Sequence, residues 1–262
     1  MIKKHFLIGL IFMVVVSSCV KEKLYSELSD LYGTGVIEIG THNVSGNIGE
    51  IFSKYVYTTA PNGGRIEVFG TSGVSDDQMI YAREIIEQYL TSDGLIYKQK
   101  HKAIIANSLA NRRSAIVFWD SENQYEANID KVSAIGYNVQ DLYATESWGS
   151  GRRDASYEEI LHLVHNYGIA PTLFEYQSRI QKANDDAIKS GLWSPWGDLP
   201  KADFDDEYFA AVMDCYLGLW EDQDGTMGGT YKPSSRAEMK DQDPVGYKLI
   251  LDLFGEIEPV RK

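Results

Sequence analysis

The order of its hydrophobic patterns constrains the fold of this sequence more than any other feature. Strand-like alternation is confined to the first half of the chain, and the second half carries the spacing typical of amphipathic helices. This order predicts an α+β fold with an N-terminal mixed sheet and helices, followed by a mostly helical C-terminal half. Since no long linker or internal repeat interrupts the pattern, residues 35–262 are expected to form a single domain.

The same patterns predict the individual elements. The turn-rich segment Pro61–Gly64 between two apolar runs predicts a hairpin, and Ser75 is a typical helix start. The expected strands are 35–39, 55–59, 65–69, 115–119 and 132–137. The expected helices are 75–93, 100–110, 157–166, 173–189, 205–220 and 244–254.

The N-terminus has the features of an export signal. Lys3 and Lys4 precede an apolar run over 6–16, which is shorter than the roughly 20 apolar residues that a membrane-spanning helix needs. The run ends in Val16-Ser17-Ser18-Cys19, which resembles the processing box of bacterial lipoproteins. The resemblance implies that residues 1–18 are a lipoprotein signal peptide.

The same resemblance predicts where the protein lies. It implies that Cys19 is lipidated, that residues 19–34 serve as anchor and tether, and that the lipid bilayer of a bacterial cell envelope is a partner. Val20, in place of an aspartate, favours the outer membrane over the inner membrane. The alternative is an ordinary secretory signal with a chance cysteine.

The charge balance argues against nucleic acid as a partner. The chain has 38 acidic and 25 basic residues, a net charge of −13, and no evident basic stripe. Phosphate backbones repel such a chain, and anionic lipid should repel the protein body, which leaves the anchor to hold it. Cys215 has no disulfide partner if Cys19 is lipidated, and its apolar neighbours indicate a small buried hydrophobe.

One predicted helix carries residues that can bind metal. In the segment from Ser156 to Gly168, Glu158, His162 and His165 form one stripe beside an apolar face. A carboxylate and an imidazole four residues apart can bind the same metal ion. The segment is therefore a candidate metal site.

Two short motifs resemble the zincin metallopeptidases. The run Glu158-Glu159-Ile160-Leu161-His162 is similar to the zincin pentapeptide His-Glu-x-x-His, with Glu158 in place of the first histidine. The run Asp205–Ala210 resembles the downstream gluzincin helix that supplies a third ligand, with Glu207 at the ligand position. The resemblance covers about residues 65–220 and lacks the first histidine.

This resemblance implies a zincin-like domain and a chemistry. Glu158, His162 and Glu207 would bind Zn²⁺, and Glu159 would be the general base of a metal-dependent peptide hydrolase. Two carboxylates and one imidazole form a more anionic site, which should be less selective for Zn²⁺. His165 could supply a second imidazole, although its spacing from His162 is not that of zincins.

A structural alternative accounts for the same residues. Ser156 and Glu159 match a capping box, and Gly168 matches a helix C-terminus. On this alternative the chain is a non-catalytic, lipid-anchored binding or structural protein. Glu158 and Glu159 would then point at backbone N–H groups, whereas a metal site requires His162 and Glu207 to converge.

Overall fold

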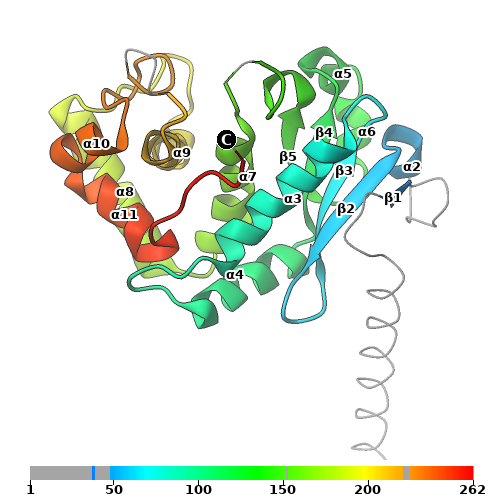
Figure 1. Cartoon of the computed structure of the whole chain (residues 1–262), viewed down its shortest axis with the longest axis horizontal. Helices are drawn as coiled ribbons and strands as arrows, with labels where there is room; N and C mark the ends of the chain where they lie inside the picture. The colour runs from blue at the N-terminus through cyan, green and yellow to red at the C-terminus, as the bar shows by residue number, and fades with distance from the viewer. Residues whose placement is uncertain (1–36, 39–47, 152, 221–224, 262) are drawn as a thin grey trace, which may run out of the picture.

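The computed structural model describes residues 37–38, 48–151, 153–220 and 225–261. The expected signal peptide, Cys19 and the tether lie outside these residues. The described part is α+β, with a mixed sheet in the first half of the chain and helices in the second (Figure 1). The predicted α+β class is therefore confirmed.

Four six-residue strands and one two-residue strand form the described sheet, in the order β1-β2-β3-β4-β5. The strands are β1 (Ile37–Glu38), β2 (Lys54–Thr59), β3 (Arg65–Gly70), β4 (Ser114–Trp119) and β5 (Asn138–Tyr143). β2 is antiparallel to both β1 and β3, whereas β3, β4 and β5 are parallel to one another. The predicted hairpin is confirmed, since β2 and β3 pair directly and Ala60 N donates to Gly64 O at 2.8 Å.

The described helices include all those expected from the sequence. They are α2 (Ile48–Ile51), α3 (Asp76–Thr91), α4 (Gln99–Asn111), α5 (Glu122–Glu126), α6 (Ile129–Ser133), α7 (Ser156–Val164), α8 (Phe174–Ser190), α9 (Phe204–Leu217), α10 (Arg236–Gln242) and α11 (Pro244–Phe254). Short 3₁₀ turns occur at η2 (Ala144–Glu146) and η4 (Lys201–Asp203), and a π-helical turn at η3 (His165–Ile169).

The strand expected at 132–137 is wrong. Its first part belongs to α6, and Val132 of α6 and Ile135, just after the helix, are buried three residues apart against the sheet; the strand follows as β5. β5 was missed because its sequence, NVQDLY, is mostly half-exposed and polar. The short helix α10 was also missed, because Met239 is its only buried residue.

Helices cover both faces of the sheet. One face packs against α3, α4 and α7, and the other against α2, α6 and the residues around them. β4 is consequently buried along its whole length, as its continuous apolar run indicates. On the side of α7 away from the sheet lies α9, around which α8, α10 and α11 pack (Figure 1). Thus α7 lies between the sheet and the C-terminal helices.

Gly168 does not end a helix. The π turn η3 continues α7 beyond Val164, and Ala170 N donates to His165 O at 2.9 Å. A Cβ at Gly168 would lie 2.7 Å from Ile105 Cγ2 of α4. The glycine therefore serves the close approach of α4, and the C-terminal role expected for it is wrong.

Two further observations concern the chain's apolar segments. No helix among the described residues has both the length and the apolar character needed to cross a membrane. Cys215 is a free, fully buried thiol in α9, and burial raises its pKa to about 12. This environment agrees with the prediction of an inert, buried cysteine.

Candidate metal site

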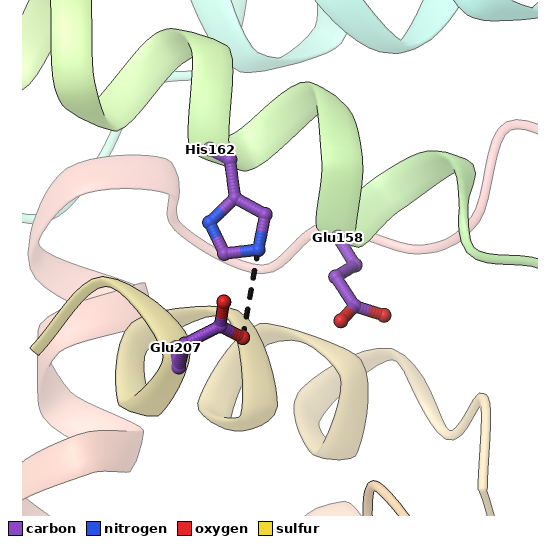
Figure 2. A group of neighbouring side chains, drawn as sticks. All are labelled: Glu158, His162 and Glu207. Atoms are coloured by element: carbon purple, nitrogen blue, oxygen red, sulfur yellow. Dashed lines mark ion pairs between the residues drawn. The ribbon is translucent and has the colours of Figure 1, made fainter. Parts of the chain in front are cut away.

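The three predicted metal ligands lie together where α7 and α9 pack. Figure 2 shows Glu158 and His162 on α7 and Glu207 on α9, with the His162 ring and the Glu207 carboxylate pointing toward each other. One ligand atom from each side chain lies within 4.8 Å of the other two. His162 Nε2 and Glu207 Oε2 are 3.8 Å apart, which is too long for a hydrogen bond. These three side chains could hold a metal ion.

A carboxylate behind His162 orients its ring. His162 Nδ1 lies 2.8 Å from Asp206 Oδ2, so Nδ1 carries the hydrogen and Nε2 faces Glu207. Metal-binding histidines typically donate their other ring N–H to a carboxylate in this way. Asp206 Oδ2 also accepts a hydrogen bond of 2.9 Å from Asn166 Nδ2, which holds the Asp206 carboxylate in place. The orientation of the His162 ring is therefore fixed.

His165 is not available as a ligand. Its Nδ1 contacts Asp206, and its Nε2 lies 2.6 Å from Gln177 Oε1. Gln177 Nε2 in turn donates to Asp205 Oδ2 at 2.7 Å, which sets the direction of the amide. Both ring nitrogens of His165 therefore face acceptors. The prediction that His165 could supply a second metal-binding imidazole is wrong.

Glu159 does not form the capping box that the sequence suggested. The N-cap of α7 is Ala155, one residue earlier than expected, and Ser156 Oγ pairs with Ser147 Oγ at 2.8 Å. Glu159 instead accepts a hydrogen bond of 2.7 Å from Gln140 Nε2 on β5. Its carboxylate is thus held between α7 and the edge of the described sheet.

Glu158 is paired with the guanidinium of Arg153. Arg153 Nη1 lies 2.6 Å from Glu158 Oε2 and 2.9 Å from Asp214 Oδ2. Asp214 is fully buried on α9 and also accepts from Trp220 Nε1 at 2.9 Å. Neither Glu158 nor Glu159 is therefore explained by a backbone cap, which removes the main support of the structural alternative.

The site concentrates negative charge in a buried place. Burial raises the pKa of Glu207 to about 7 and that of Glu159 to about 8. Burial alone would raise the pKa of Asp206, but the two imidazoles lower it well below its usual range. Burial alone would lower the pKa of His162, but Asp206 raises it well above its usual range. A bound divalent cation would compensate the carboxylates that are otherwise costly to ionise.

These shifts predict that the metal-free protein loses stability as pH rises. Burial raises the pKa of Glu159 and of Asp214 to about 8 and that of Glu207 to about 7, so these acids stay protonated in the folded chain at pH values where the unfolded chain has released those protons. His162, with its raised pKa, acts in the same direction. The folded state binds more protons between pH 5 and pH 8, so the free energy of unfolding should fall across this window, by up to about 4 kcal/mol for each group that stays protonated throughout it.

Urea unfolding at pH 5.5 and pH 8 in the presence of a chelator measures this effect. Asp214→Asn is the matched control, because an amide resembles the protonated acid and should flatten the pH dependence without a loss at pH 5.5. Stability that rises toward pH 8 would contradict the assignment of raised pKa values.

Sequence reasoning found the three candidate ligands but missed the residues that support them. Asp206 stands beside Glu207 in the acidic first turn of α9, and the need of a metal-binding histidine for a carboxylate partner could have singled it out. Arg153 lies outside any helix or strand, and no sequence signal connects it to Glu158.

Comparison of the chain with family models, with curated proteins and with solved structures found no match.

Proposed function

We propose that this chain is a lipid-anchored protein of the bacterial cell envelope and a metal-dependent peptide hydrolase with a zincin-like domain. Its metal, with Zn²⁺ as the expected ion, would be held by Glu158, His162 and Glu207. One observation carries the proposal: three ligand atoms from two helices lie within 4.8 Å of one another. The anchor would be Cys19, with the outer membrane favoured.

The donor set suits zinc. Zn²⁺ binds nitrogen and oxygen ligands at about 2.0–2.2 Å, so two ligand atoms of a tetrahedral site lie about 3.3–3.6 Å apart. The 3.8 Å between His162 Nε2 and Glu207 Oε2 needs to shorten only slightly to match. The imidazole favours Zn²⁺ over Mg²⁺ or Ca²⁺, and three protein ligands leave one position open, as in catalytic zinc sites.

Glu159 would carry the proton in hydrolysis. When bound, the metal would polarise a substrate carbonyl and acidify a water molecule. Glu159 is the residue that the zincin resemblance assigns as general base. Burial raises its pKa to about 8, close to the pH at which proton transfer is most effective, and Gln140 orients the carboxylate.

A second candidate is a metal-free scaffold that binds a partner or supports the envelope. The ion pair between Arg153 and Glu158 favours it, because Glu158 is neutralised without any metal. Arg153 pairs with Glu158 Oε2, however, which leaves Glu158 Oε1 for a bond to the metal. Among the described residues, no ion pair joins Arg153 to Glu207. Metal binding therefore separates the two candidates.

Wild-type protein is expected to contain about one divalent metal ion per chain. His162→Ala and Glu207→Ala should bind the metal at least a hundredfold more weakly. Loss of a direct ligand should lower the metal affinity more than loss of a residue that supports a ligand, which typically costs 10–100-fold. Metal content is measured by mass spectrometry on the full chain purified without chelator. His101→Ala, an imidazole on α4, is the matched control. No metal in wild type after Zn²⁺ addition would leave the scaffold as the function.

A further inference from the structure

The charge of this acidic chain is unevenly distributed. From Gly94 to Trp119 there is no aspartate or glutamate, which makes this the longest stretch of the chain without an acid. The stretch covers the loop before α4, α4 itself and β4. Its basic residues are Lys98, Lys100, Lys102, Arg112 and Arg113. The expectation that the protein body repels anionic surfaces therefore need not hold for this segment.

Large apolar side chains are exposed on the same part of the molecule. Leu95 is 63% exposed, Ile96 51%, Ile104 47% and Phe174 72%. The loop before α4 meets the start of α8, because the rings of Tyr97 and Tyr176 have centroids 5.0 Å apart. Ile104 lines a shallow groove with Pro171 and Thr172, which precede Phe174. The four exposed apolar residues and two exposed lysines are here named the α4 surface: Leu95, Ile96, Ile104, Phe174, Lys98 and Lys100.

We propose that the α4 surface docks onto an anionic lipid bilayer. Its aliphatic and aromatic side chains would enter the interfacial region, and Lys98 and Lys100 would contact the headgroups. Exposed apolar residues interleaved with lysine are typical of surfaces that lie in a membrane interface. Protein–protein interfaces, by contrast, are depleted of lysine, which favours lipid over a protein partner.

Because the proposed anchor already holds the protein at the bilayer, the α4 surface needs only a weak affinity for lipid. The chain from Cys19 to Ile37 spans at most about 60 Å when fully extended, so an anchored body cannot leave the bilayer. Docking is then an intramolecular step with a high effective concentration. This inference rests on the proposed lipidation and is independent of the metal site.

Two acids border the α4 surface and oppose docking. Asp93 precedes the acid-free stretch, and Glu175 follows Phe174; both are exposed. Lys98 Nζ donates one hydrogen bond to Gly94 O at 2.6 Å and keeps its other hydrogens for headgroups. Replacing Glu175 by glutamine should therefore strengthen docking on anionic vesicles, by about fivefold in the docked-to-free ratio.

A fluorescent label tests the proposal on the full acylated chain. Ile104→Cys and Ile129→Cys are a matched pair, because both isoleucines are helical and 47% exposed, but Ile129 lies on α6 across the sheet (Figure 1). Cys215 is buried, so an environment-sensitive dye should label only the introduced thiol. Intact mass first verifies acylation of Cys19, and its absence would count against the anchor rather than the surface.

In vesicles of phosphatidylcholine with phosphatidylglycerol, the label at 104 should shift to the blue and be quenched by nitroxide lipid, whereas the label at 129 stays in water. Lys98→Gln with Lys100→Gln should lower the docked-to-free ratio about 25-fold, at about fivefold per lysine. Equal quenching at both positions would overturn the proposal. So would a label at 104 that leaves water only when an envelope protein is added, since this marks a protein interface.

Discussion

Replacing Asp206 by alanine is expected to lower the free energy of unfolding by about 3–5 kcal/mol, because the change leaves two buried imidazoles without their shared carboxylate. His162 and His165 are 6% and 2% exposed, and each contacts Asp206 through its Nδ1. Asn166 loses an acceptor as well. Urea unfolding in the presence of chelator measures the loss without any contribution from bound metal.

Asp206→Asn is the matched variant, and it should cost only about 1–2 kcal/mol. The amide oxygen can accept from His162 Nδ1 and Asn166, while the amide nitrogen donates to His165 Nδ1. His165 Nε2 then still donates to Gln177 Oε1, as the amide direction of Gln177 requires. Equal losses for the alanine and asparagine variants would contradict this hydrogen-bond assignment.

The second large effect concerns chemistry. Glu159→Gln is expected to slow peptide hydrolysis by about 10²- to 10⁴-fold, the contribution typical of a general base. Glutamine can still accept from Gln140 Nε2, so the variant should fold and keep its metal. The measurement is the hydrolysis rate of quenched fluorescent peptides by the Zn²⁺-loaded full chain, beside metal content.

The outcomes separate catalysis from binding. A wild-type protein that binds metal but cleaves no peptide would leave a metal-binding envelope protein and remove the hydrolase. Equal hydrolysis rates for wild type and Glu159→Gln would retain the hydrolase and dismiss Glu159 as its base.

Local signals in the sequence predicted many of the elements. A helix was predicted near 244–254, and it is observed at Pro244–Phe254, where Pro244 occupies its first turn, Asp243 caps it and Gly255 follows it. β4 was predicted because a continuous apolar run bounded by polar residues is typical of a strand covered on both faces. Where one segment carries both the apolar pattern of a helix or strand and the residues that begin and end it, the sequence alone predicts that element.

The candidate site could be predicted only in part, because some of its contacts depend on how separate helices pack together. Helical spacing places Glu158 and His162 on one stripe, and the zincin resemblance added Glu207, all three of which lie together in the structure. The contacts of Asp206 with two histidines depend on how α9 lies against α7, and periodicity does not report that packing. The π turn at 165–169 likewise has no signal in the spacing of apolar residues.

The pairing of Glu158 with Arg153 bears on whether the chain folds before or after it binds metal. Three acids of the site have a partner within the chain: Arg153 for Glu158, Gln140 for Glu159 and two imidazoles for Asp206. Small zinc domains whose ligands lack such partners fold only when metal binds. Here folding need not wait for metal, and loading becomes a later, reversible step governed by the metal supply around the finished protein.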